Sequence, residues 1–427
     1  MVSTMLAICG GSPVRTNPFP AWPVFDEREE QALLAVLRSG NWWQFAYGQG
    51  LELQENPDAE VSQTTHFEAE FARAHDCSCG IAAANGTATL EIILRALGIG
   101  PGDEVIVPPY TFIASASSVL QIGAVPIFVD IDPETLNIDP RHIPEAITER
   151  TRAIMPVHFG GQCADMDAVN EIARAHGFFV VEDAAHAHGG SWRGRKCGSL
   201  GDAGSFSFQA SKNMTAGEGG IITTNNAELA ARCRSYLWAG REPDRPWYEH
   251  HRLGWNYRIT EFQSAILRVQ LSRLPEQTAR RQANGHYLAE QLRARVPGLV
   301  PQAIDPRVTS MTYHVFLSRY RPEAFGGMPR QQFIDALNAE GIPCMGGYNH
   351  PLYRNPMFVN KEFWNGAFPC TPPYARELDY TDFIERCPVS EALCQDSVWF
   401  AQNLFVGSRD DVEDILQAIV KIQQAVG

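Results

Sequence analysis

The sequence predicts an α/β fold, in which a mostly parallel central sheet is covered by helices and followed by a smaller α+β part. Short β-branched runs alternate with amphipathic helical stretches between about residues 87 and 224. This alternation is typical of parallel sheets with helices on both faces. The chain has 427 residues, which favours two domains over one small core. Sheets of this kind bind ligands at the carboxyl ends of their strands.

Local signals place the elements in order along the chain. Four prolines in residues 1–24 predict an extended arm, and the helical spacing of residues 26–39 ends at Gly40. The polar, Gly- and Pro-punctuated segment 44–62 predicts a loop. The expected helices cover 67–75, 87–97, 164–176, 258–290, 329–340 and 410–426, and Pro275 allows a kink in the longest of them. The expected strands cover 104–107, 124–129, 153–158, 178–182, 205–208 and 221–224.

We expect three parts in the chain. Residues 1–24 form the N-terminal arm, and residues 25–290 form a large domain that carries the sheet. Residues 291–427 mix short strands with helices and form a small C-terminal domain.

The charge balance argues against some classes of partner. The chain has 35 basic and 49 acidic residues, a formal net charge of −14. Nucleic acids and anionic membranes are bound by clustered Lys and Arg, so we expect neither as a partner. Phosphate binding stays open, because backbone amides bind phosphate without a net positive charge. No apolar run approaches the about 20 residues of a membrane span.

The cysteines indicate a reducing compartment. Ten cysteines are scattered along the chain, without a CxxC and without a Cys/His group at zinc-ligand spacing. We therefore expect free buried thiols and no metal site. The first ten residues lack the basic residue and the apolar core of a signal peptide. The expected location is the cytoplasm.

The segments VVEDAAHAHGG (180–190) and GSFSFQASKNMTAGEGG (204–220) carry the most chemical information. Asp183 closes a predicted buried strand, where a carboxylate is costly unless a cation pairs with it. Lys212 follows a second strand, in a loop that returns through a Gly-rich turn. A lysine there can form a Schiff base with an aldehyde cofactor, and an aspartate can hold the cofactor's pyridine nitrogen protonated. Taken singly, they also fit a surface lysine in a turn and an aspartate that caps a helix.

A second segment favours a phosphate-binding site. Asn85, Gly86 and Thr87 open a predicted helix, where exposed amides and the helix dipole attract phosphate. Many helices begin in this way for capping only. Ser207 can add a hydroxyl to the same phosphate, and Phe112 can stack on a cofactor ring or belong to the core.

The motifs NGTATL, DEVIVPPYTFIAS, PVHFGG, VVEDAAHAHG, FSFQASKNMTAGEGG and NYRITEFQSAIL together resemble the DegT/StrS family of sugar aminotransferases. The similarity runs from about Phe19 to the C-terminus. It implies a type I aminotransferase fold, a pyridoxal 5′-phosphate (PLP) cofactor and a homodimer with shared active sites.

The resemblance also implies roles for single residues. Lys212 matches the Schiff-base lysine and Asp183 the partner of the pyridine nitrogen. The other matches are the phosphate-binding Gly86, Thr87 and Ser207, the ring-stacking Phe112, the cofactor-contacting position of His186, and Asn256, which reaches the phosphate of the neighbouring subunit. From its residues alone, Asn256 can equally cap the helix that begins near Thr260.

Two departures from the family pattern concern the substrate. Many members have Gln where this chain has His186, and His where it has Gln209. The combination is similar to 3-amino-5-hydroxybenzoate synthases, and Gln209 also resembles glutamine-dependent scyllo-inosose aminotransferases. This implies a keto-cyclitol as acceptor, ahead of a nucleotide-linked keto-sugar. The segment 44–62 is longer than in either relative.

Three aromatic residues are candidate substrate contacts. Tyr348 and His350 lie where family members contact substrate, and both are equally compatible with ordinary loop residues. Trp43, with its neighbour Trp42, can line the pocket or pack the loop before it.

The sequence thus predicts a PLP-dependent aminotransferase that moves an amino group from glutamine, or from glutamate as the second choice, to a keto-cyclitol or keto-sugar. A 3-amino-5-hydroxybenzoate synthase would use the same lysine. A PLP-dependent sugar dehydratase is disfavoured, because those relatives have His in place of the lysine. A non-catalytic sensor on the same fold is expected to lose Lys212 or Asp183, and both are present.

Overall fold

A seven-stranded sheet forms the centre of the larger part of the protein. The computed structural model describes residues 5–44, 46–47, 53–54, 62–243, 245–246, 248–363 and 378–426. The strand order is β3-β11-β10-β7-β6-β4-β5, and β11 alone runs against the other six. The strands are β3 (Cys79–Ala83), β4 (Glu104–Val107), β5 (Val125–Phe128), β6 (Thr151–Ile154), β7 (Phe179–Asp183), β10 (Ala203–Ser207) and β11 (Gly220–Thr224). The predicted mostly parallel sheet is confirmed.

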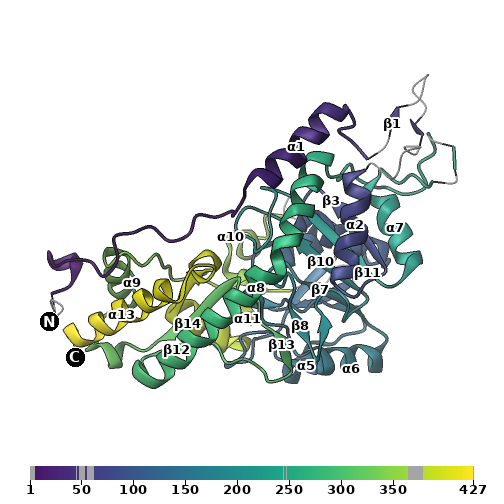
Figure 1. The fold of residues 1–427 in the computed structure, drawn as a ribbon. Coiled ribbons are helices and arrows are strands. Elements are labelled where there is room, and N and C mark those ends of the chain that lie inside the picture. The colour runs from purple at the N-terminus through teal and green to yellow at the C-terminus, as the bar shows by residue number, and fades with distance from the viewer. Residues whose placement is uncertain are drawn as a thin grey trace.

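Helices connect and cover these strands (Figure 1). They are α1 (Glu27–Ser39), α2 (Gln63–Ala74), α3 (Gly86–Ala96), α4 (Ala114–Gln121), α5 (Ile143–Ala146), α6 (Met166–His176), α7 (Ala227–Leu237) and α8 (Glu261–Arg295). Side-chain caps fix where several begin. Asp26 starts α1 and Thr260 starts α8, each with a capping box, and the Asn85 side chain caps α3. The long helical region predicted over 258–290 is one helix that contains Pro275.

A smaller unit lies at the end of the molecule where both chain termini are found (Figure 1). Its antiparallel sheet has the order β12-β14-β15. The elements are β12 (Leu299–Pro301), β14 (Val315–Tyr320), β15 (Ser397–Ala401), α9 (Arg330–Ala339) and α13 (Arg409–Val426). They share a hydrophobic core that also takes in Leu288, Ala289 and Leu292 of α8.

The remaining elements are short. β8 (Ser191–Trp192), β9 (Arg195–Lys196) and β13 (Val308–Ser310) form a three-stranded sheet. The helices α10 (Pro356–Val359) and α11 (Phe383–Arg386) pack on the core of the large sheet through Phe358 and Phe383, and α12 (Pro388–Asp396) precedes β15. The domain boundaries placed after residues 24 and 290 stay a prediction.

Most of the loop predicted over 44–62 lies outside the described residues. Its described part contains a short antiparallel pair, β1 (Ala46–Tyr47) and β2 (Leu53–Gln54). The N-terminal arm, beginning with a short 3₁₀ helix at Ala7–Cys9, contacts both parts of the protein. Arg15 forms ion pairs with Asp411 and Asp414 of α13, and the Trp22 Nε1 donates to the Ala210 carbonyl at 2.9 Å.

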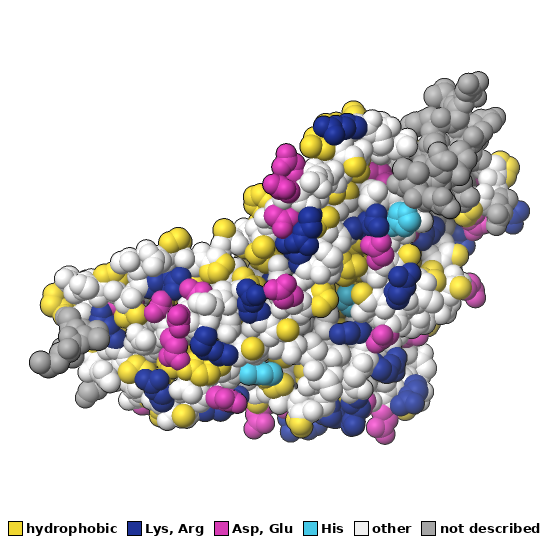
Figure 2. All heavy atoms as spheres, viewed as in Figure 1, with side chains coloured by type: hydrophobic (Ala, Val, Ile, Leu, Met, Phe, Trp, Pro, Cys, Tyr) yellow, Lys and Arg dark blue, Asp and Glu magenta, His cyan; other side chains and the backbone are white. Residues whose placement is uncertain are grey.

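No helix within the described ranges is long and apolar enough to cross a membrane. On the face shown in Figure 2, basic and acidic side chains are interspersed.

Candidate active site

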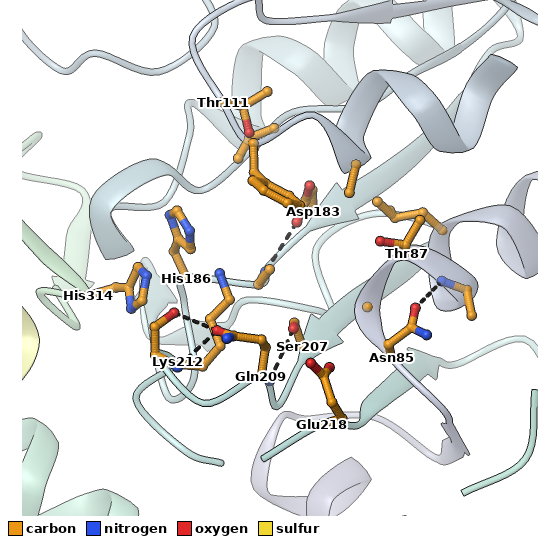
Figure 3. A pocket seen from close by; sticks show the side chains of 18 of the residues that line it. Asn85, Thr87, Thr111, Asp183, His186, Ser207, Gln209, Lys212, Glu218 and His314 are labelled. Carbon is orange, nitrogen blue, oxygen red and sulfur yellow. Dashed lines mark hydrogen bonds between the residues drawn. The ribbon is translucent and has the colours of Figure 1, made fainter. Parts of the chain in front are cut away.

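A cavity of about 740 Å³ lies where β7 and β10 end and α3 begins. β7 and β10 are neighbouring parallel strands, with Ser205 opposite Asp183. Figure 3 shows Asp183 between His186 and Lys212 on one side and Thr87 on the other. The cavity is therefore at the sheet edge where parallel strands place ligands.

Asp183 is the last residue of β7, and only 6% of its surface is exposed. Its Oδ2 accepts a hydrogen bond from the Ser115 Oγ at 2.7 Å, and its Oδ1 accepts one from the Ala185 N–H at 3.2 Å. These bonds orient the carboxylate, and no ion pair is found for it among the described residues. A buried carboxylate that lines a cavity is suited to a cationic ligand group.

Lys212 is partly buried in the loop between β10 and β11, and its side chain lines the cavity. Within the loop, the Lys212 backbone N–H donates to the Gln209 carbonyl at 2.9 Å. Gly217, at a φ of 83°, allows the return to β11. Burial lowers the pKa of the Lys212 amine from 10.5 to about 8, and the negative charge of Asp183 opposes this change. The amine can therefore lose its proton near neutral pH.

One end of the cavity lies at the start of α3 and is lined by Asn85, Gly86, Thr87 and Ser207. The Asn85 Oδ1 accepts from the Ala88 N–H at 2.8 Å, while the amides of Gly86 and Thr87 are in the first helical turn and have no intrahelical acceptor. A Cβ at Gly86 would lie 2.7 Å from the Cβ of Ser207. Glycine is needed here because the helix start and the strand end approach so closely. The arrangement suits an anion such as phosphate.

Two neutral histidines lie beside Lys212. The rings of His186 and His314 have centroids 4.1 Å apart. Burial and the positive charge of Lys212 hold the pKa of each ring well below the usual value. The His314 Nδ1 is 3.2 Å from the Asn213 Oδ1, whereas the buried Nδ1 of His186 has no hydrogen-bond partner among the described residues. His186 therefore has an unused polar atom at the cavity.

Aromatic and acidic side chains form the rest of the cavity wall. Tyr348 packs against Trp399 with ring centroids 4.9 Å apart. Phe112 also lines the cavity, with 55% of its surface exposed. The Tyr257 hydroxyl donates to the Glu91 Oε2 at 3.2 Å, and burial raises the pKa of Glu91.

Three predicted site residues do not line this cavity in the single chain. Trp43 lies beside Arg258, just before α8, with the guanidinium carbon 5.2 Å from its ring centroid. His350 is exposed and lies outside the cavity lining. Asn256 is also exposed and pairs with Trp238 in an isolated β-bridge. The other predicted residues, Gly86, Thr87, Phe112, Asp183, His186, Ser207, Lys212 and Tyr348, are brought together.

Several residues that line the cavity were not predicted from the sequence. His314 and Trp399 come from the second half of the chain, outside the six motifs that carry the family resemblance. Tyr257 and Glu218 are inside the NYR and GEGG motifs, so these motifs contained a usable signal. Thr111 likewise lies within the DEVIVPPYTFIAS motif, and Glu91 directly follows the NGTATL motif.

Comparisons with known proteins agree with this geometry. A protein from Streptoalloteichus tenebrarius, named as a candidate L-glutamine:3-amino-2,3-dideoxy-scyllo-inosose aminotransferase, is 40% identical over 432 residues, covering 100% of this chain and 99% of the relative. An L-glutamine:2-deoxy-scyllo-inosose aminotransferase of the same organism is 38% identical, over 98% of this chain and 97% of its own.

The fold is similar to that of a solved 3-amino-5-hydroxybenzoic acid synthase, with a TM-score of 0.83 and 34% identity, over 97% of this chain and 99% of that one. The sequence profile of the DegT/DnrJ/EryC1/StrS aminotransferase family matches residues 53–378. The chain belongs to the DegT/DnrJ/EryC1/StrS aminotransferase family.

Proposed function

We propose that this aminotransferase uses Lys212 and Asp183 to move an amino group from L-glutamine to a ketone on a hydroxylated carbocycle. The observation that carries the proposal is the placement of Lys212, Asp183 and the Gly86–Ser207 contact around one cavity. These three features would each contact a different part of one PLP molecule. Their presence around one cavity argues against the alternatives that Lys212 is only a surface lysine in a turn and that Asp183 only caps a helix.

The residues present fit PLP, the cofactor of this family. The amides of Gly86 and Thr87 and the Ser207 hydroxyl would hold the phosphate, where a Cβ at Gly86 would fill the available space. The Asp183 carboxylate would hold the pyridine nitrogen, and the unpartnered Nδ1 of His186 is available to a polar group on the ring. Phe112 would pack against the ring.

When bound, PLP supplies an aldehyde that condenses with amines and a ring that accepts electron density. The chain's own residues do the rest. Lys212 would hold the cofactor through its Nζ, and its neutral amine can take a proton from the Cα of a bound amino donor. The Asp183 carboxylate would keep a proton on the pyridine nitrogen, which favours the electron-accepting state of the ring. The neutral rings of His186 and His314 add no positive charge beside Lys212.

The charge of the cavity favours a carbocyclic acceptor over a nucleotide-linked sugar. Lys212 is the one Lys or Arg among the described lining residues, and Glu91 and Glu218 add acidic groups. A nucleotide diphosphate carries at least two negative charges and binds best where cations meet it. The names of the relatives, which specify glutamine and scyllo-inosose derivatives, support the same choice of donor and acceptor.

The similarity to 3-amino-5-hydroxybenzoic acid synthase favours a second candidate function. Such an enzyme would use Lys212 to eliminate water from an aminated ring, and its product would be aromatic.

A homodimer is also part of the proposal. Asn256 is exposed in the single chain, outside its own cavity, which is the position needed for a residue that serves a neighbouring subunit.

Borohydride reduction tests the role of Lys212. The chain has four lysines, Lys196, Lys212, Lys361 and Lys421, so three serve as internal controls. We expect the purified protein to be yellow and the reduced cofactor to be attached to the peptide that contains Lys212. Attachment to another lysine would refute the assignment.

Substrate tests then separate the two functions. Keto-cyclitols and nucleotide keto-sugars are offered with glutamine or glutamate, and product amines are measured by mass. We expect glutamine with a keto-cyclitol to give the highest rate. An aromatic product from an aminated ring would favour the synthase, and transfer restricted to nucleotide keto-sugars would exclude a carbocyclic acceptor.

A further inference from the structure

Two cysteine thiols and one histidine imidazole lie close together near the end of β7, the strand that carries Asp183. His158 follows β6, Cys163 lies five residues later, and Cys197 follows β9. Their exposed fractions are 0%, 2% and 0%, and one ligand atom from each lies within 4.8 Å of the others. We call these three residues the thiol–imidazole cluster. It is the one group of three such residues found in the described part of the chain.

A buried carboxylate orients the histidine of this cluster. The His158 Nδ1 accepts the Ala164 N–H at 3.1 Å, so the Nε2 carries the proton and donates to the Glu182 Oε2 at 2.9 Å. Glu182 also accepts the backbone N–H groups of Gly198, Leu200 and Gly201, each at 2.7 Å. A histidine whose second nitrogen donates to a carboxylate is the usual arrangement around protein-bound zinc.

We propose that the Cys163 Sγ, the Cys197 Sγ and the His158 Nδ1 bind a thiophilic divalent cation, represented by Zn²⁺. Thiolate and imidazole ligands select zinc over Mg²⁺ or Ca²⁺, which prefer oxygen. Tetrahedral zinc with bonds of about 2.0–2.3 Å places its ligand atoms about 3.5–3.8 Å apart. One imidazole nitrogen of His158 and the two Sγ atoms lie within 4.8 Å of one another, so their separations exceed those of a zinc site by about 1 Å at most.

Binding exchanges a hydrogen bond for a metal bond. The His158 Nδ1 would release the Ala164 N–H, which directly follows Cys163 and can turn to that thiolate. Both thiols give up a proton, so about two protons leave for each Zn²⁺ that binds. The two thiolates neutralise the ion, and Glu182 keeps its four donors.

A second cavity gives a cation a route to the cluster. Its volume is about 210 Å³ and Cys163 lines it. Four aspartates and two arginines also line it, which attracts cations: Asp132, Asp139, Asp165, Asp305, Arg141 and Arg307. A water molecule from this cavity can take the fourth zinc position, as in sites with three protein ligands.

The thiol–imidazole cluster lies next to the backbone of Asp183, the predicted catalytic aspartate. The His158 N–H donates to the Asp183 carbonyl at 3.0 Å, and Glu182 precedes Asp183 in β7. The metal would join the loop after β6 to the end of β9 and so hold the end of β7 in place. We therefore assign it a structural role that supports the position of Asp183.

Metal analysis of the PLP-loaded protein tests the proposal. After incubation with Zn²⁺ and gel filtration, we expect about one Zn²⁺ per chain in the parent and its loss in Cys163→Ala and Cys197→Ala. Cys233→Ala is the matched control, because Cys233 is equally buried but lies on α7 outside the cluster. The parent and the control should also show a Zn²⁺-dependent rise in melting temperature that both cluster variants lack.

Thiol labelling of the parent keeps the test valid if the variants do not fold. Zn²⁺ should slow alkylation of Cys163 and Cys197, while exposed Cys9 reacts at an unchanged rate. Zinc that persists in both cluster variants would overturn the proposal. The proposal would also be overturned if the reduced parent protein took up no zinc. A disulfide between Cys163 and Cys197, formed in preference to zinc binding, would overturn it as well.

Discussion

Replacing Lys212 by Met should stabilise the cofactor-free protein at neutral pH. Burial lowers the pKa of Lys212 from 10.5 to about 8, a difference that corresponds to about 3 kcal/mol. This free energy opposes folding, because the folded protein holds the charged amine less favourably than the unfolded chain does. Met has a similar length and no charge, so it removes the cost. The attraction to Asp183 is already included in the lowered pKa.

The effect should depend on pH in a defined direction. Between about pH 8 and 10.5 the unfolded chain binds more protons than the folded one, so the stability of the parent rises with pH. The cost is complete below pH 8 and absent above about pH 10.5. The advantage of Lys212→Met should therefore be largest near pH 7 and shrink towards pH 10.

Denaturant unfolding of both apo-proteins at pH 7 and pH 10 measures this. Lys196→Met is a control for loss of a lysine outside the cavity, because Lys196 lies on β9 and its Nζ donates to the Gly189 carbonyl. Equal or lower stability of Lys212→Met at pH 7 would refute the reasoning. So would an advantage that is the same at both pH values.

Three further outcomes are expected. Asp183→Asn should keep bound cofactor but slow transamination at least tenfold. The lost carboxylate charge lowers the pKa of the pyridine nitrogen by about 1–3 units, which is worth about 1.4–4 kcal/mol. Half-reaction rates within about threefold of the parent would contradict this. Gly86→Ala should weaken cofactor binding by about 1–3 kcal/mol, since its Cβ would lie 2.7 Å from that of Ser207; titration of the apo-protein with PLP checks it, and unchanged affinity would remove Gly86 from the phosphate site. Mixing Lys212→Ala with Asn256→Ala subunits should partly restore activity, because one site of the mixed dimer is intact; mixed dimers without activity would exclude the shared site.

Local sequence patterns were sufficient for much of the fold. The strand predicted at 104–107 has the same bounds in the structure, and the helix predicted at 87–97 differs by one residue at each end. These elements were predictable because apolar periodicity and capping residues act over a few positions of the chain. The Asp183 and Lys212 positions followed from the same logic, since each comes at or after the end of a strand.

The sequence gives less information about which loop residues face the cavity. Tyr348 lines it, but His350, two residues away, is exposed. Trp43, the third candidate substrate contact, lies beside Arg258 and outside the cavity lining in the single chain. Loops lack the strict periodicity of strands and helices, so spacing along the chain does not fix the direction of their side chains.

The sequence by itself thus determined the fold class, the order of the main elements and the pair of strand ends that carry Asp183 and Lys212. Only the tertiary structure decided that His314 and Trp399 reach that cavity from the second half of the chain. Only the tertiary structure also brought Cys197 to His158 and Cys163, although no zinc-type spacing links them. The physical reason is that strand neighbours and packed loops are chosen by burial over long separations in sequence, whereas propensity and periodicity report only on nearby residues.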